Sequence, residues 1–348
     1  MAYSSITKPT LYFDTVTWDT VDTSIDTLSF APDFAWIKIR DNADSHCGFD
    51  TVRGAQKRIT LGQTSAESTQ SAELTAFNSD GYTLGTGDNV NRTGKKACSW
   101  NWKGGGTAAS NSDGTITSSV SANTTAGFSV VSYTGNATAG ATVGHGLGVT
   151  PGMIWVKVRS TTNNWAVYHE TMGATKAAYL DGTSAQTTDG WLNNTAPTSS
   201  VFTLSNGNYG NTNGNTHIAY CFAEKKGYSK IGSYEGNGST NGTFIYTGFK
   251  PALVIIKNID ATKHWMLYDN KRANEFNPQN ERMIISGAFT SYESDSRAID
   301  FLSNGFKMKD NGTDSSSVNV SGNTHIYYAV AESPLVANVS GGLPTTAR

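Results

Sequence analysis

Three segments of this chain share one pattern, and that pattern constrains the fold more than any other feature. Each segment starts with a proline, carries a lysine six residues later, and alternates between two sets of side chains in between: Pro32 to Lys38, Pro151 to Lys157 and Pro251 to Lys257. Alternation with period two predicts a β-strand, and proline is tolerated where a strand begins. We therefore expect one face of each strand to point inward and one strand-centred unit to occur three times.

The match between the three copies extends beyond this strand. The residues fourteen positions after the three prolines are His46, Trp165 and Trp265. The residues eighteen positions after them are Asp50, His169 and Asp269. Two copies also share the string Gly-Asn-Thr-His-Ile, which begins at Gly214 and Gly322. A match of this length at a fixed offset indicates an internal repeat.

The repeats predict an all-β fold of three tandem antiparallel β-sandwich units of the lectin or jelly-roll kind. Only 16% of the residues are charged, and glycine is frequent, which suits short strands and polar turns better than long helices. The predicted boundaries are residues 1–106 for the first repeat, 107–126 for a Gly/Ser/Thr-rich linker or loop, 127–227 for the second repeat, 228–336 for the third, and 337–348 for a tail.

Several classes of function are disfavoured by the composition. The net charge of −2 gives no basic excess for nucleic acid, and no apolar run approaches the ~20 residues of a membrane helix, so we expect no nucleic-acid partner and no membrane insertion. The N-terminus lacks a signal-peptide pattern, so we expect assembly in a cytoplasm. Cys47, Cys98 and Cys221 are odd in number and lack metal-ligand spacing, which favours buried free thiols.

Catalytic and metal-binding patterns are weak. A glycosidase needs two carboxylates facing one substrate, and the only acids in matching register are Asp50 and Asp269; a pair such as Asp295 with Asp300 is not marked by any pattern. The loops 41–44 and 310–314 carry calcium-type oxygens, but Asx-turns explain them better. We expect no enzyme activity, no cofactor and no metal. His217 and His325 are expected to be half-buried, hydrogen-bonded strand residues.

The tryptophans are the remaining candidates for a site: Trp155, Trp165, Trp191 and Trp265. As a binding hypothesis, their rings contact a glycan or another subunit; the alternative is that they fill the sandwich core. Trp165 and Trp265 each open a strand directly after a polar loop. We therefore expect these two at the rim of the sandwich, where an indole is seldom fully buried.

Several motifs resemble a known family. They are Phe30 to Lys38, Phe49 to Gly54, Asn78 to Gly85, Cys98 to Lys103 and the opening Ile6 to Phe13. Together they resemble a tandem-repeat β-rich domain of unknown function found in structural proteins of tailed bacteriophages, notably marine and cyanobacterial phages. The likeness is strong in the first copy and weaker in the third, where Asp269 to Arg272 replaces the Asp-Ser-Val-Arg-Gly-like residues. The resemblance implies a lectin-like β-sandwich in a virion, and it supplies no catalytic residues.

The resemblance leads to one main expectation and two alternatives. The main expectation is a virion protein of the tail-fibre or receptor-binding kind that contacts host surface glycan. The alternatives are a capsid decoration protein or head fibre and, third, a tailspike glycan hydrolase. The expected partners are other virion proteins and further copies of the chain, with a trimer favoured, because the open edges of small sandwiches need cover.

Overall fold

The computed structural model describes residues 4, 6–19, 22–207, 209–272, 276–293 and 297–335. Within these ranges the regular elements are strands, apart from one 3₁₀ turn, η1 (Pro9–Leu11). The strands assemble into antiparallel sheets, and the order of strands closes none of them into a barrel. The predicted all-β class is confirmed, and the arrangement fits a β-sandwich. None of the described residues forms a helix long and apolar enough to cross a membrane.

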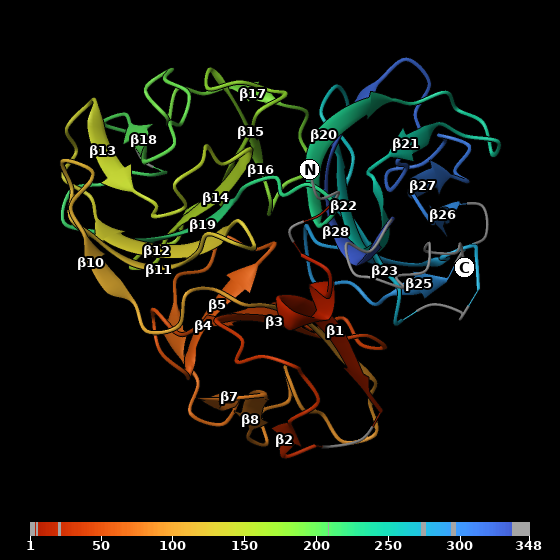
Figure 1. Cartoon of the computed structure of the whole chain (residues 1–348), viewed down its shortest axis with the longest axis horizontal. Helices are drawn as coiled ribbons and strands as arrows, with labels where there is room; N and C mark the ends of the chain where they lie inside the picture. The colour runs from red at the N-terminus through yellow and green to blue at the C-terminus, as the bar shows by residue number, and fades with distance from the viewer. Residues whose placement is uncertain are drawn as a thin grey trace.

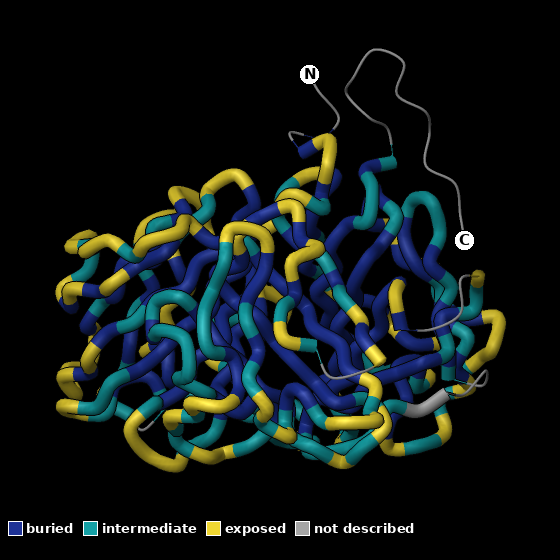
Figure 2. Tube along the Cα trace, turned by 90° about the horizontal axis from the view of Figure 1, so that it is seen from below, coloured by how far each residue is buried: buried dark blue, intermediate teal, exposed yellow. Residues whose placement is uncertain are grey.

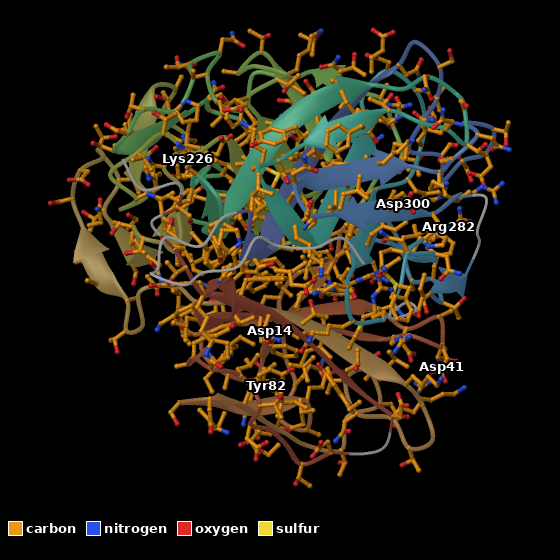
Figure 3. The ribbon with its side chains drawn as sticks, turned by 45° about the vertical axis from the view of Figure 1, so that its right-hand side comes forward. Asp14, Asp41, Tyr82, Lys226, Arg282 and Asp300 are labelled. Atoms are coloured by element: carbon orange, nitrogen blue, oxygen red, sulfur yellow. The ribbon has the colours of Figure 1, made fainter. Side chains whose placement is uncertain are left out.

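The first large sheet and its small sheet are built from residues 13–102. The large sheet has, in spatial order, β1 (Phe13–Trp18), β9 (Ala97–Trp102), β3 (Phe34–Ile39), β4 (His46–Asp50), β5 (Lys57–Leu61) and β6 (Ser68–Thr69). The small sheet has β2 (Ser24–Ile25), β8 (Gly81–Leu84) and β7 (Leu74–Asn78). The two sheets are joined by side chains such as Tyr82, labelled in Figure 3, whose hydroxyl donates a hydrogen bond to Ser99 Oγ at 2.7 Å.

The second large sheet repeats this order and adds two strands. It has β10 (Ala109–Asn111), β11 (Ser118–Asn123), β12 (Phe128–Thr134), β19 (Thr216–Phe222), β14 (Met153–Val158), β15 (Ala166–His169), β16 (Lys176–Tyr179) and β17 (Thr187–Thr188). Its small sheet has β13 (Ala141–Gly144) and β18 (Val201–Leu204).

The third large sheet returns to six strands. It has β20 (Ser229–Glu235), β28 (Thr324–Pro334), β22 (Phe249–Asn258), β23 (Met266–Asp269), β24 (Glu281–Ile284) and β25 (Tyr292–Glu293). Its small sheet has β21 (Phe244–Tyr246), β27 (Gly305–Met308) and β26 (Ile299–Leu302). The predicted tail, residues 337–348, lies outside the described residues.

The stretch 107–126 differs from its prediction as a linker or loop. Strands β10 and β11 form within it, and β11 pairs with β12 along six residues. This stretch has little apolar content, but Val120 and Ser121 are buried against the sheet. Backbone pairing to an existing edge strand therefore stabilises strands that side-chain composition alone does not indicate.

The three repeated strands hold equivalent places in the large sheets. Ile37 lies opposite Cys47 and Ser99, Val156 lies opposite Ala166 and Ala219, and Ile256 lies opposite Met266 and Tyr327. In each case one partner lies ten residues later in the chain and the other lies on the closing strand of the same large sheet. The division of the chain into three repeats at the predicted boundaries stays an interpretation, to which this register lends support.

The large sheets share one apolar core, which we call the central core. Its members come from all three large sheets; examples are Phe34 and Trp36 from the first, Met153 and Trp155 from the second, and Leu253 and Ile255 from the third. Figure 1 shows the three lobes arranged around this centre, and Figure 2 shows buried chain throughout the interior with exposed segments on the outer loops.

The central core corrects one expectation about the repeated strands. We expect one inward face from the alternation, but β3, β14 and all of β22 from Pro251 to Asn258 are buried on both faces. In β3, Phe34 and Trp36 face the central core, while Ala35 and Ile37 belong to the separate core between the first large sheet and its small sheet. The second face is buried because a neighbouring large sheet covers it.

Candidate functional site: the junctions between the large sheets

The tryptophans predicted to contact a ligand are all buried. Trp155 and Trp165 are 0% exposed, Trp265 is 1% exposed and Trp191 is 2% exposed. The expectation that Trp165 and Trp265 lie at an exposed rim is therefore wrong. The polar loop before each one has solvent-exposed residues, but its later residues bond a loop of the preceding large sheet: the Asn163 N–H donates to the oxygen of Thr64 and the Lys263 N–H to that of Thr183, each at 2.9 Å. The tryptophan that follows therefore enters the interior.

Trp165 and Trp265 make the same contact at two different junctions. The indole Nε1–H of Trp165 donates a hydrogen bond to the backbone oxygen of Thr60 at 2.9 Å, and that of Trp265 donates to the oxygen of Tyr179 at 2.8 Å. Thr60 is on the first large sheet and Tyr179 on the second. Each tryptophan thus satisfies a carbonyl of the preceding large sheet while its ring fills the central core.

His46 makes the third contact of this kind. The Trp36 indole donates a hydrogen bond to His46 Nδ1 at 2.9 Å, so Nε2 carries the proton and donates to the oxygen of Ile284 at 2.9 Å. Ile284 is on the third large sheet, so the three contacts together link each large sheet to the next and close a ring. The residues at position fourteen of the repeat are therefore junction residues. Burial holds the pKa of His46 well below its usual value.

Backbone hydrogen bonds follow the same cyclic order. Glu67 donates its N–H to the oxygen of Arg159 at 2.8 Å, and Gln186 donates to Ile259 at 2.9 Å. The third bond of the set runs from Ser291 to the oxygen of Arg40 at 2.7 Å. The same backbone bond thus occurs at all three junctions between the large sheets.

The residues at position eighteen also lie at the junctions. Tyr220 on the second large sheet donates its hydroxyl proton to Asp50 Oδ2 at 2.7 Å, and Asp50 forms an ion pair with Arg53. In the third large sheet Asp269 pairs with Arg272 and accepts a hydrogen bond from the Trp100 indole at 2.8 Å. Tyr220 and Trp100 occupy equivalent places in their sheets, because Tyr220 lies opposite Trp155 and Trp100 lies opposite Trp36.

These ion pairs place the only register-matched acids out of reach of a substrate. The side chains of Asp50, Arg53, Asp269 and Arg272 are all 0% exposed. Burial by itself raises the pKa of Asp269, but the charge and hydrogen bond of Arg272 outweigh it, and the net pKa is lowered. His169, the equivalent residue of the second sheet, donates from Nε2 to the oxygen of Tyr327 at 3.3 Å.

The lysines that define the repeat are buried as well. Lys38, Lys157 and Lys257 are 0% exposed, and their ammonium groups donate to backbone oxygens. Lys157 bonds the oxygen of Thr64 on the first large sheet's loop at 2.8 Å, and Lys257 bonds that of Thr183 at 3.1 Å. Burial lowers the pKa of Lys257 to about 7. Two of the three lysines therefore link neighbouring loops.

His217 and His325 stack on tyrosines inside the sandwich. The ring of His217 lies 5.0 Å from that of Tyr133 at an interplanar angle of 7°, and His325 lies 5.0 Å from Tyr234 at 9°. Both histidines are fully buried rather than half-buried as expected. His325 also contacts Asn258 at 3.2 Å and the backbone oxygen of Asn323 at 3.0 Å. Burial lowers the pKa of each to about 4.

The other predicted features take structural roles. Asp310 accepts hydrogen bonds from the N–H of Gly312 and Val318 and from Ser317 Oγ, so its carboxylate is occupied by its own loop. Within the described ranges no group of three or more His, Cys, Asp or Glu is placed to hold a metal. Asp295 lies outside the described residues, so its pairing with Asp300 stays untested. The three cysteines are buried free thiols, as predicted.

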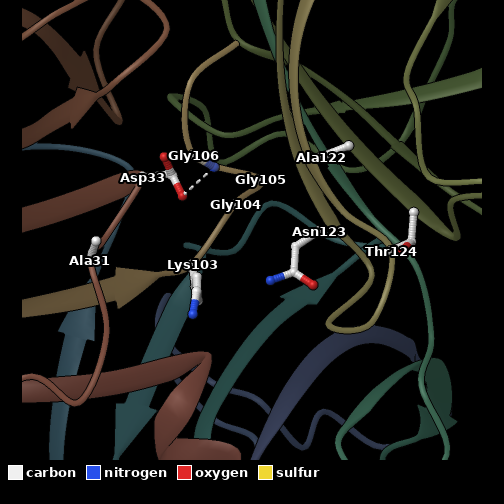
Figure 4. Close-up of a pocket in the computed structure, with 9 residues that line it drawn as sticks. All are labelled: Ala31, Asp33, Lys103, Gly104, Gly105, Gly106, Ala122, Asn123 and Thr124. Atoms are coloured by element: carbon white, nitrogen blue, oxygen red, sulfur yellow. Dashed lines mark hydrogen bonds between the residues drawn. The ribbon is translucent and has the colours of Figure 1, made fainter. Parts of the chain in front are cut away.

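A surface cleft of about 360 Å³ lies where the first large sheet passes into the second (Figure 4). Asp33 accepts hydrogen bonds from Thr51 Oγ1 at 2.8 Å and from the Gly106 N–H at 3.2 Å. Burial raises its pKa. Lys103 lies over the ring of Tyr12, with Nζ 5.8 Å from its centre. Asp33 therefore holds the segment Gly104 to Gly106, through which the chain passes from the first large sheet to the second.

The sequence does not reveal the junction partners of these residues. Arg53 and Arg272 follow Asp50 and Asp269 by three residues in both copies. A comparison of the repeats could have used this shared spacing to predict the two ion pairs. The carbonyls of Thr60, Tyr179 and Ile284 carry no sequence signal, because any residue supplies a backbone oxygen.

Fold and junctions define a class: an all-β sandwich protein in which three large sheets close around one apolar core. The chain belongs to the family described as a domain of unknown function (DUF7483), whose model matches residues 8–334. That match spans the described sheets from η1 to the end of β28. No curated protein and no solved structure matches the chain.

Proposed function

We propose that this chain is a structural protein of a bacteriophage virion, of the tail-associated fibre or receptor-binding kind. The observation that carries the proposal is the use made of the repeated polar residues. Two of the three repeated lysines, the two aspartates and the position-fourteen residues all contact a neighbouring large sheet or one of its loops. A chain whose recurring polar groups are devoted to rigidity is suited to holding loops in fixed positions rather than to chemistry.

The burial of Asp50 and Asp269 supports a non-enzymatic role. Each carboxylate is enclosed with an arginine and an aromatic hydrogen-bond donor, and a glycosidase needs both of its carboxylates at a substrate. The motif resemblance supports a place in the virion, with assembly in the host cytoplasm and with other virion proteins as partners. The host surface glycan is the proposed ligand of the exposed loops.

Location on the particle tests this proposal. An antibody raised against the purified chain is applied with gold label to virions of the phage that encodes it, and the label is located by electron microscopy. We expect label at the tail. Label over the head would instead favour the capsid decoration role, and the absence of label from intact and opened particles would overturn the virion assignment.

The proposed assembly is a homo-oligomer, with a trimer favoured. Edge strands such as β1 and β20 end the large sheets, and open edges in a protein of modest apolar content are covered by subunit contacts in many assemblies. Light scattering on the purified chain measures this directly. A stable monomer at micromolar concentration that also binds no purified virion protein would contradict it.

A further inference from the structure

The edge strand β21 of the third small sheet exposes two aromatic side chains on one face. Phe244 is 45% exposed and Tyr246 is 54% exposed, whereas Ile245 between them is 6% exposed and packs inward. Aromatic rings exposed to this extent bury little area within their own chain. Residues two apart in a strand share a face, so the two rings form one apolar surface about 7 Å long.

The other two small sheets show that the fold does not require aromatics here. Ile245 lies opposite Phe306, in the way that Val143 lies opposite Phe202 and Ile25 lies opposite Tyr82. The residues on either side of these inward positions are Ser24 and Asp26 in the first small sheet, Thr142 and Gly144 in the second, and Phe244 and Tyr246 in the third. Polar or small residues thus suffice at two of three equivalent places.

A polar cleft adjoins this aromatic surface. Tyr246 borders a cleft of about 200 Å³ that is also lined by Glu224, Lys226 and Lys230. Lys230 Nζ donates hydrogen bonds to both oxygens of the Glu224 carboxylate, at 2.7 and 2.9 Å. Lys226, labelled in Figure 3, is exposed in the segment that joins β19 to β20. The cleft is therefore lined by charged groups of both signs beside an exposed ring.

We propose that Tyr246, Phe244 and this cleft form a saccharide-binding site. A sugar ring presents C–H groups on its face and hydroxyl groups at its edge, which match an aromatic surface and a cleft with both donors and acceptors. The second ring, Phe244, extends the surface to a second sugar unit. The Glu224 carboxylate in the cleft repels acidic groups and is paired with Lys230, so the net charge of the cleft is small and the site fits a neutral oligosaccharide better than a strongly acidic one.

This assignment rests on the receptor-binding function proposed above and names the part of the chain that performs it. The test is native affinity electrophoresis of the purified full chain in gels that contain dextran, mannan or alginate. The variant Phe244→Ser with Tyr246→Asp installs the residues that the first small sheet has at these places, so we expect it to fold. Val149→Ser, which changes another exposed apolar residue, 38% exposed, is the matched control.

We expect dextran or mannan to retard the unchanged chain and the control alike, and the double variant to lose at least tenfold in apparent affinity with an unchanged melting temperature. Equal retardation of the double variant would overturn the site. Retardation by alginate alone, or by none of the three polymers, would overturn a neutral saccharide as the ligand. Gold labelling of virions is independent of this result, so the site and the virion function fail separately.

Discussion

Replacing Trp265 by phenylalanine removes one junction hydrogen bond while keeping an aromatic ring in the central core. The Trp265 indole donates to the oxygen of Tyr179 at 2.8 Å, and the side chain is 1% exposed. Phenylalanine has no donor, so that carbonyl loses its partner in the interior. A buried acceptor left without a partner costs about 1–3 kcal/mol, and the smaller ring adds a cavity cost to this.

The measurement is urea denaturation followed by tryptophan fluorescence and circular dichroism. We expect Trp265→Phe to lower the free energy of unfolding by about 2–4 kcal/mol, which combines a lost hydrogen bond and a partly filled cavity. Trp265→Ala removes the ring as well and is expected to cost about 3–5 kcal/mol or more. The midpoint should fall with little change of slope.

Trp191→Phe is the matched control. Trp191 is 2% exposed, but its Nε1 has no hydrogen-bond partner among the described residues. The same change there shrinks the ring without breaking a bond, so we expect a smaller loss than at Trp265. Equal losses at the two positions would refute the role given to the junction hydrogen bond, and no loss at Trp265 would refute its place in the core.

Three further predictions follow from the junctions and the buried groups. Asp269→Asn removes the close counter-charge of the buried Arg272 guanidinium and leaves only the Glu281 carboxylate, 3.8 Å away. We expect a loss of about 3–5 kcal/mol in urea denaturation, and a loss below about 1 kcal/mol would contradict the buried pair. Gly62→Ala should lower the melting temperature severely, because φ is +73° and an added Cβ would lie 1.8 Å from the backbone oxygen of Ile285. The control is Gly94→Ala, where φ is +70° but no atom lies near the added Cβ, and this variant should lower the melting temperature far less. Burial lowers the folded-state pKa of His169, His217 and His325 to about 4, so the unfolded chain takes up these protons at higher pH than the folded chain does. We therefore expect the free energy of unfolding to fall as the pH drops from about 6.5 to 5, by about 1.4 kcal/mol per pH unit for each histidine. A melting temperature that stays constant over this range would refute this prediction.

The strand pattern predicts the class of fold and the equivalence of the repeated strands but not how the sheets pack. Alternation in Phe34 to Ile39 indicates a strand, yet the presence of Lys38 on one face suggests a solvated side. Lys38 is in fact buried, with its ammonium group bonded to the backbone oxygen of Asn42 at 2.9 Å. A lysine satisfied by carbonyls has the same sequence signature as an exposed one, so the central core could not be predicted from alternation.

The candidate site shows the same limit. Register comparison finds that His46, Trp165 and Trp265 are equivalent, and this equivalence holds in the junction contacts. It does not distinguish rim from interior, because that depends on a neighbouring large sheet distant in sequence. Phe244 and Tyr246 could have been found from the sequence by extending the same comparison to the small sheets, where the other two copies have small or polar residues.

The central claim is that the three large sheets form one body around a shared core. Differential scanning calorimetry of the full chain tests it most directly, by comparing the calorimetric enthalpy with the van't Hoff enthalpy of the transition. The shared core predicts a single transition with a ratio near one, shifted as a whole by Trp265→Phe. Two or three separable transitions, with only one of them moved by that substitution, would contradict it.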